Sequence, residues 1–160
     1  MLVDFNSLPT SSRIWIFPSD RKLSPSEVNE IQNLLDNFIS NWSAHGQELQ
    51  ASYILPHNRF IIVAVNTDFN QITGCSIDSL VYTIQEIEKK YNLVLLDKMN
   101  VTFKNGEFFT HKPLNEFKKM AKEKAVSQET IVFNNLVNTI EEWQDFWEVP
   151  AKESWHNRFF

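Results

Sequence analysis

The sequence predicts an α+β fold: a ferredoxin-like split β-α-β core with an antiparallel sheet, an extra hairpin and a C-terminal helical extension. Two observations lead to this prediction. Two long segments repeat apolar residues at helical spacing, and short runs rich in branched and aromatic residues surround them in the order strand, helix, two strands, helix. The chain has no internal repeat, low-complexity run or linker, so we expect a single domain over residues 1–160.

The first strand and the first helix have clear boundaries. Residues 13–17 are branched and aromatic after a leading arginine, which predicts a short buried strand. Ser24 and Glu27 then have the spacing of a capping box, and an apolar face at helical spacing follows. We expect this helix to extend to about His45 and to end at Gly46 in a left-handed conformation.

A strand pair and a second helix come next. Residues 49–55 and 59–65 predict two strands joined as a hairpin, and the second is a near-continuous apolar run typical of a central strand. Ser76 or a neighbour is expected to cap a second amphipathic helix that ends near Asn92. These elements supply all of a split β-α-β unit except its last strand.

The next part of the chain is expected to complete the sheet and extend it. Residues 101–103 predict the missing strand, an Asn-Gly turn at 105–106 predicts a hairpin, and residues 108–111 predict the partner strand. A third helix should follow Pro113. A second capping box predicts a short helix over residues 139–147.

Two C-terminal segments complete the chain. Residues 131–133 fit either a strand or a buried turn, and the sequence leaves both alternatives open. Residues 154–160 contain Trp155 and Phe159, whose large rings are costly to leave in water. We therefore expect both rings to pack against the domain or against a second copy of it.

Composition and charge exclude several classes of protein. The net charge of −5 argues against nucleic acid or anionic lipid as a partner. No stretch approaches the roughly 18 apolar residues of a membrane span, and the first residues show no signal-peptide pattern. A single cysteine excludes an internal disulfide, which fits a reducing compartment. We therefore expect a soluble cytoplasmic protein with no membrane partner.

The stretch most informative for chemistry is residues 70–78, where a strand pattern passes into a helix pattern. It contains the only cysteine and one of three glycines. Backbone N–H groups at a helix N-terminus can bind an anion or favour a thiolate. Gly74, Cys75 and Ser76 are therefore the candidate ligand-binding residues, and Gly74 is expected to supply a positive φ or a close backbone approach.

Cys75, His45 and Asp78 are the candidate catalytic residues. A nucleophilic cysteine needs a general base within hydrogen-bond reach, and His45 is the natural candidate. In a split β-α-β fold, however, we expect the end of the first helix and the start of the second at opposite ends of the sheet. That topology argues against a direct Cys75–His45 pair, so we expect Cys75 to be a small buried apolar residue instead.

The few glycines exclude the common nucleotide-binding loops. Only Gly46, Gly74 and Gly106 are present, so neither a Walker A loop nor a dinucleotide-binding fingerprint can form. The four histidines and the single cysteine show no metal-ligand spacing. We therefore expect no cofactor, no metal and no P-loop ATPase activity.

A group of lysines precedes and occupies the third predicted helix. Lys112, Lys118, Lys119, Lys122 and Lys124 fit either a phosphate- or nucleic-acid-binding patch or a basic solvent face. These lysines lack interleaved arginines and aromatic platforms, which favours the solvent face.

Four segments spread over the chain carry a resemblance to a known family: residues 42–46 (Trp-Ser-Ala-His-Gly), 73–78 (Thr-Gly-Cys-Ser-Ile-Asp), 96–101 (Leu-Asp-Lys-Met-Asn-Val) and 154–160 (Ser-Trp-His-Asn-Arg-Phe-Phe). In these segments the chain resembles an uncharacterised family of bacterial proteins of about the same length, chiefly from Bacteroidetes. Members of that family are often labelled automatically as ABC transporter ATPases. The resemblance therefore implies an ATPase activity that the lack of a P-loop contradicts.

Three functions follow from the sequence, in this order. The first is a non-enzymatic binding or assembly domain without ATPase activity, with a homodimer through its sheet or its C-terminal aromatic surface as the expected assembly. The second is a small enzyme or thiol-dependent ligand site at the Gly74–Asp78 junction. The third is an RNA-binding domain that stacks bases on residues 59–65, where Phe60 is the only aromatic residue.

Overall fold

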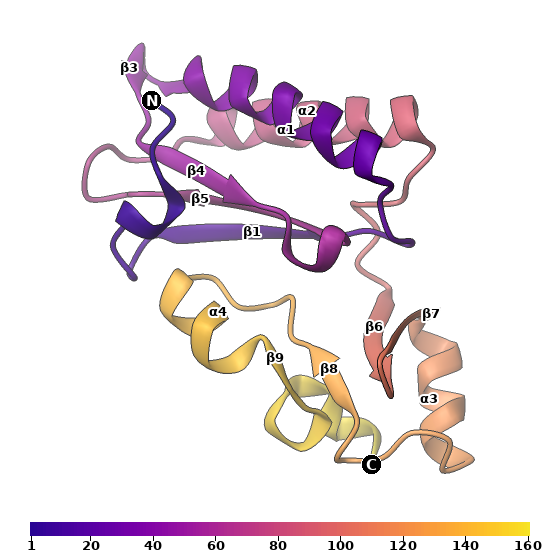
Figure 1. The fold of residues 1–160 in the computed structure, drawn as a ribbon. Coiled ribbons are helices and arrows are strands. Elements are labelled where there is room, and N and C mark those ends of the chain that lie inside the picture. The colour runs from indigo at the N-terminus through magenta and orange to yellow at the C-terminus, as the bar shows by residue number, and fades with distance from the viewer. The chain divides into compact units, whose positions relative to one another are not determined.

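The structure, a computed structural model, describes residues 1–160 and divides into two compact units (Figure 1). The first unit comprises Met1–Leu96 and Asn138–Ile140, and the second comprises Asp97–Val137 and Glu141–Phe160. Both units combine helices with antiparallel strands, so the predicted α+β class is confirmed. The expectation that the whole chain forms one domain stays a prediction.

The first unit contains two long helices, five strands and two short 3-10 helices, which are labelled η. In chain order these are η1 (Phe5–Ser7), β1 (Arg13–Pro18), α1 (Pro25–Ser40), β2 (Ser43–Ala44), β3 (Gln47–Glu48), β4 (Ala51–Ile54), η2 (Pro56–Asn58), β5 (Phe60–Val65) and α2 (Gly74–Tyr91).

The main sheet of the first unit has the strand order β1-β5-β4, and both pairs are antiparallel. The predicted hairpin of β4 and β5 is confirmed, with Tyr53 opposite Val63. On its other side β5 pairs with β1, where Ile14 lies opposite Ala64. Every residue of β5 is buried, as its continuous apolar sequence predicts for a central strand.

The predicted fourth strand of this sheet is wrong. Residues 101–103 belong to a different sheet, in the second unit, because beside their predicted hairpin partner they pair with residues 131–133 and not with β1. Beside β1 there is only an isolated antiparallel bridge between Arg13 and Thr139. Two backbone hydrogen bonds hold it, from the Ile14 N–H to the Asn138 carbonyl at 2.9 Å and from the Ile140 N–H to the Ser12 carbonyl at 3.1 Å.

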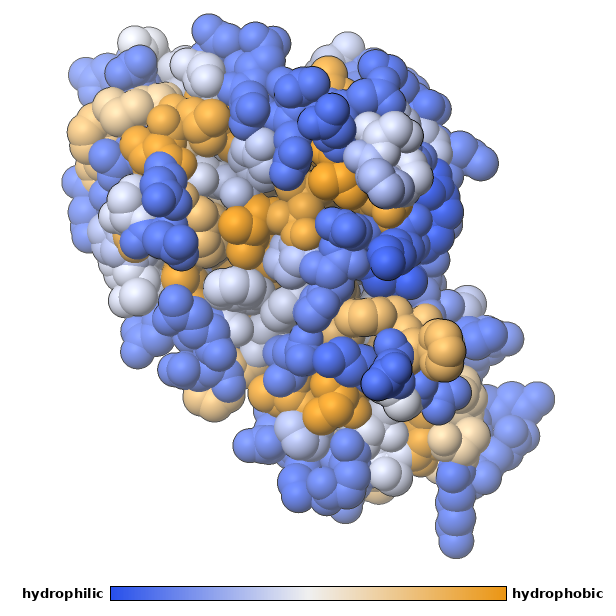
Figure 2. Space-filling view, viewed as in Figure 1, coloured by the Kyte–Doolittle hydropathy of each residue, from blue (hydrophilic) through white to orange (hydrophobic).

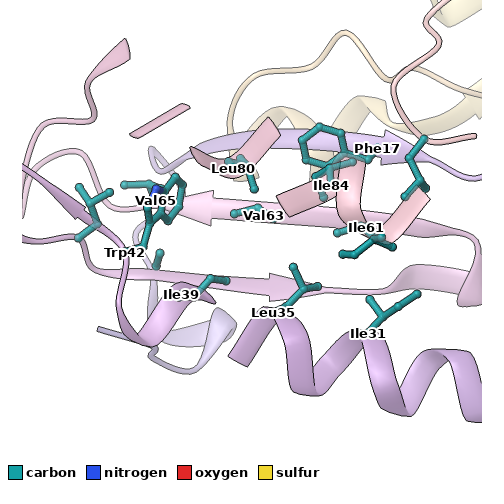
Figure 3. Close-up of a cluster of buried hydrophobic side chains, with 14 of the residues drawn as sticks. Phe17, Ile31, Leu35, Ile39, Trp42, Ile61, Val63, Val65, Leu80 and Ile84 are labelled. Atoms are coloured by element: carbon teal, nitrogen blue, oxygen red, sulfur yellow. The ribbon is translucent and has the colours of Figure 1, made fainter. Parts of the chain in front are cut away.

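Helices α1 and α2 cover one face of this sheet (Figure 1). Along β5, alternate residues point to the same face, and on each helix apolar residues recur about once a turn. The resulting cluster includes Ile31, Leu35 and Ile39 of α1, Leu80 and Ile84 of α2, and Ile61, Val63 and Val65 of β5 (Figure 3). Each of these side chains stabilises the fold by roughly 1.5–3 kcal/mol through its burial.

Helix α1 ends five residues earlier than the sequence predicts, at Ser40 rather than about His45. The reason is a turn between the two-residue strands β2 and β3, which lie antiparallel. His45 and Gly46 form this turn with φ values of 52° and 75°, which no right-handed helix accommodates. Helix α2 ends as predicted, at Asn92 in the left-handed conformation.

The second unit is built on a four-stranded antiparallel sheet with the order β7-β6-β8-β9. In chain order its elements are β6 (Asn100–Asn105), β7 (Phe108–Pro113), α3 (Leu114–Lys122), β8 (Ile131–Phe133), α4 (Ile140–Phe146), β9 (Glu148–Pro150), η3 (Ala151–Glu153) and η4 (Trp155–Phe159). The predicted hairpin, the third helix and the short fourth helix are confirmed. Residues 131–133, which the sequence left open, form a strand.

The surface mixes apolar and polar residues. On the face shown in Figure 2, apolar residues form separate patches among hydrophilic ones. Such patches are ordinary, because apolar atoms contribute more than half of the accessible surface of most folded proteins. None of the helices is both long enough and apolar enough to span a bilayer.

The start of α1 is held by a capping box and an ion pair that share one carboxylate. Ser24 Oγ accepts a hydrogen bond from the Glu27 backbone N–H, while Glu27 accepts one from the Ser24 N–H at 2.8 Å. The Arg21 guanidinium donates to both Glu27 oxygens, at 2.8 and 2.7 Å. The hydrogen bonds that Glu27 accepts from the Arg21 side chain and from the Ser24 N–H lower the pKa of Glu27 to about 2.

We expect the Glu27→Gln variant to lose up to about 1 kcal/mol of unfolding free energy at neutral pH, because it removes the charge that pairs with Arg21, while the glutamine oxygen can still accept the Ser24 N–H of the capping box. The folded-state pKa of Glu27 is depressed, so its contribution is present above pH 4.5 and is lost as the pH falls toward 2. Urea unfolding across this pH range should therefore show that the free energy of unfolding falls more steeply toward low pH in wild type than in the variant. Glu30→Gln, an exposed change on the same helix, is the control. Parallel acid profiles for wild type and Glu27→Gln would contradict the assignment.

Candidate functional site

The stretch singled out by the sequence forms the N-terminus of α2. Thr73 is the N-cap, and its Oγ1 accepts a hydrogen bond from the Ser76 backbone N–H at 3.1 Å. Ser76 is buried, and its hydroxyl donates to the Ser43 carbonyl at 2.8 Å. The Ser76 side chain therefore ties the start of α2 to the segment that follows α1.

A second bond joins the same two segments, from Trp42 Nε1 to the Ser76 carbonyl at 2.9 Å. The expectation that the end of the first helix and the start of the second lie at opposite ends of the sheet is wrong. Strand β5 runs antiparallel to β1, so the helix that follows β5 runs antiparallel to the helix that follows β1. The C-terminus of α1 and the N-terminus of α2 are consequently neighbours.

The three candidate catalytic residues lie near this junction, but they form no catalytic arrangement. His45, Cys75 and Asp78 all have exposed side chains, and no hydrogen bond joins the thiol to the imidazole or the carboxylate. The expected burial of Cys75 is wrong, because the second position of α2 faces solvent while Ser76 faces inward. A thiol with no base in reach is accessible without being activated by a partner.

Gly74 does not have the role that the sequence suggested. It is the first residue of α2, its φ is not positive, and an added Cβ would have no heavy atom within 4 Å. The glycines with a positive φ are Gly46, in the turn between β2 and β3, and Gly106, in the turn between β6 and β7. Thr73 is the N-cap of α2, so the next residue, Gly74, already has a helical backbone conformation.

Helix α3 carries a polar stripe on one face. Asn115, Lys118, Lys119 and Lys122 have the spacing i, i+3, i+4, i+7, which places them on the same side of a helix. On the other side Phe117 is fully buried. The sequence predicted a basic solvent face here, and all four stripe residues are indeed exposed.

The buried ring of Phe117 holds the C-terminal segment against α3. Its centroid lies 5.3 Å from the ring of Phe103, 5.9 Å from His156, 6.1 Å from Phe159 and 6.2 Å from Phe160. Edge-on contacts of this kind stabilise a fold by about 0.5–1.5 kcal/mol each beyond their buried area. The expected packing of the C-terminal aromatic residues against the fold is confirmed.

A groove of about 550 Å³ lies between α3 and η4. It is lined by Asn115, Lys118, Lys119, Lys122, Arg158 and Phe159. Four of these six side chains are cations and none is a carboxylate. No acidic side chain lies within ion-pair distance of any of the four cations. The groove is therefore a local concentration of positive charge in a chain whose net charge is −5.

Two of the cations lie over aromatic rings. The Arg158 guanidinium carbon is 5.7 Å from the centroid of Trp155, and Lys118 Nζ is 6.0 Å from the centroid of Phe159. These rings also contact each other, with centroids 5.9 Å apart. Cation–π attraction restricts both charged groups, so part of the entropy cost of ordering them is met before any ligand binds.

His156 belongs to η4, which forms one wall of the groove, but it does not add to the charge of the groove. It is 1% exposed, its ring stacks on Trp155 at 3.8 Å, and its Nδ1 hydrogen-bonds Ser154 Oγ at 2.8 Å. Burial, assisted by the charge of Arg158, lowers the pKa of His156 to about 4. At neutral pH His156 is therefore an uncharged packing residue.

The sequence located the lysines of this site but not their partners. Arg158 and Phe159 follow Lys118 by about forty positions, so the sequence around the lysines shows neither the arginine nor the aromatic ring that joins them. One signal was available in the last residues, where Trp155, Arg158 and Phe159 alternate aromatic and cationic side chains at helical spacing.

Two other kinds of site, a metal site and a base-stacking strand, find no support in the structure. Nowhere do three or more His, Cys, Asp or Glu side chains gather closely enough to hold a metal ion. The strand proposed for base stacking, β5, has Phe60 fully buried, so it offers no exposed aromatic platform.

Comparison with known proteins gives no further assignment. No family model, no curated protein and no solved structure matches this chain.

The two glycines should respond oppositely to alanine. Gly74→Ala should leave the free energy of unfolding unchanged or raise it by up to about 1 kcal/mol, because alanine favours a helix and meets no neighbour. Gly46→Ala should lower it by about 1–2 kcal/mol, because a Cβ is strained at a φ of +75°. Urea unfolding of both variants makes the comparison. A larger loss in Gly74→Ala than in Gly46→Ala would refute this account.

Proposed function

We propose that this chain is a binding domain without ATPase activity, and that it binds an anionic ligand in the groove between α3 and η4. One observation supports this proposal above others: four cations without carboxylate partners line a single groove of about 550 Å³. Small-ligand sites usually occupy about 300–1,000 Å³ and combine apolar walls with a few polar groups. Phe159 supplies the apolar wall here.

The spacing of the glycines supports the proposed lack of ATPase activity. A P-loop needs two glycines five positions apart followed by Lys-Ser or Lys-Thr, and the three glycines of this chain stand far apart. We also propose that the chain belongs to the Bacteroidetes family that it resembles. Membership of that family does not require the ATPase activity that its automatic label implies. A cytoplasmic location is likewise proposed, and the single cysteine supports it.

For the fold, we propose that the first unit is a ferredoxin-like unit with an incomplete fourth strand. The order β1-β5-β4 supports this, as does the bridge between Arg13 and Thr139 at the place where the fourth strand would pair.

For assembly, we propose a homodimer through the sheet or the C-terminal aromatic surface. The exposed rings of Phe146 and Phe160 support the second of these surfaces.

A thiol-dependent ligand site at the Gly74–Asp78 junction is the second candidate function. The observation that favours it is the exposure of Cys75 in the first turn of α2, where backbone N–H groups point outward. It ranks below the groove because no base or cation contacts the thiol.

Anion binding is expected to be local to the groove. In a ¹H–¹⁵N NMR titration of the intact chain with citrate and with inorganic phosphate, the amides of α3 and η4 should shift saturably. The double variant Lys118→Gln, Arg158→Gln should lose these shifts, because it removes a cation from each side of the groove. Lys22→Gln, Lys98→Gln removes the same charge elsewhere and should keep them. No saturable shift with either anion, or shifts spread over both units, would refute the proposal.

Cys75 should react with iodoacetamide in the folded protein at a rate close to that in denaturant, because its side chain is exposed. Mass spectrometry of labelled wild type measures the rate, and Cys75→Ser gives the background. Protection of the thiol until the protein unfolds would eliminate the second candidate.

A further inference from the structure

The charge of the groove indicates how much negative charge its ligand carries. Lys118, Lys119, Lys122 and Arg158 contribute four positive charges, and Asn115 adds an amide donor. One phosphate monoester carries about −1.5 to −2 at neutral pH, so it would neutralise about half of these cations. Two phosphoryl groups would match all four.

The arrangement of the cations also fits two phosphoryl groups better than one. Lys118 and Lys122 are one helical turn apart, about 5–6 Å between their Cβ atoms, and Arg158 faces them from η4. Arginine presents a planar fork that matches phosphate oxygens in pairs, while lysines act as point charges. The guanidinium of Arg158 lies over the ring of Trp155 and has no carboxylate partner, so its N–H groups are available to a ligand.

Carboxylates in the sequence around the groove disfavour a long polyanion, although Lys112 and Lys124 also flank α3. On α3 itself Glu116 stands beside the stripe, Glu123 follows its last lysine, and Glu153 ends η3; all three are exposed. A nucleic acid strand that extended beyond the groove would approach these carboxylates, and the net charge of −5 gives no attraction at longer range. A small ligand that stays within the groove avoids both costs.

We propose that the ligand of this groove is a small organic molecule with two phosphoryl groups, either linked as a diphosphate or separate as a bisphosphate. This inference rests on the proposed function, because it names the chemistry of the anion bound there. The four cations bind the phosphoryl oxygens, and the half-buried ring of Phe159 contacts the carbon framework of the ligand.

Isothermal titration calorimetry on the intact chain tests the proposal with four probes at equal ionic strength: inorganic pyrophosphate, a hexose bisphosphate, inorganic phosphate and citrate. Pyrophosphate or the hexose bisphosphate should bind at least about tenfold tighter than phosphate and citrate, since each additional charged hydrogen-bonded pair is worth about a factor of ten. Whichever of the two binds tighter identifies the phosphoryl groups as linked or separate.

Matched variants connect the affinity to the groove. Lys118→Gln, Arg158→Gln should weaken the tighter probe by at least about tenfold, while Lys22→Gln, Lys98→Gln should leave it unchanged. Circular dichroism checks that each variant is folded.

Equal affinity for citrate and both phosphoryl probes would overturn this inference and leave anion binding intact. Tighter binding of single-stranded oligothymidylate than of either phosphoryl probe would also overturn it. Failure of every probe to bind would overturn the proposed function as well.

Discussion

The groove of the second unit depends on the burial of one ring, that of Phe117. Helix α3 has nine residues, a length at which an isolated helix is not stable in water, and Phe117 is its only fully buried residue. The same ring contacts His156, Phe159 and Phe160 of the C-terminal segment. One side chain therefore fixes both walls of the groove, and the lysines on the opposite face of α3 have a defined position because of it.

The first unit uses its small polar residues in a comparable way. Thr73 caps α2, and Ser76 bonds both to that cap and to the carbonyl of Ser43. The indole of Trp42 donates to the carbonyl of Ser76. The polar residues that the sequence suggested as a chemical site therefore form hydrogen bonds between the end of α1 and the start of α2. Buried polar groups need such hydrogen-bond partners.

Local signals in the sequence predicted much of the fold, and non-local pairings account for the errors. The capping box of Ser24 and Glu27 and the Asn-Gly turn at 105–106 lie within a few residues, so spacing alone was enough to predict them. The hairpin partner of residues 101–103 was right, but their assignment to the sheet of β1 was wrong. Their second neighbour is β8, and no local pattern encodes that long-range pairing. The same distinction applies to the groove. Its lysines repeat along one helix, so the sequence predicted them. Arg158 lies near them only because the C-terminal segment packs on Phe117, which no local pattern predicts.

The bridge between Arg13 and Thr139 has a consequence for how this chain can be divided. The first unit includes Asn138–Ile140, so it is not one continuous stretch of sequence, and the second unit is interrupted by the same three residues. A fragment that stops at Leu96 would keep β1 but lose the backbone groups that bond to its outer edge at Ser12 and Ile14. An uncovered strand edge readily pairs with other chains. Such a fragment would expose a surface for aggregation that the intact chain covers with its own late segment.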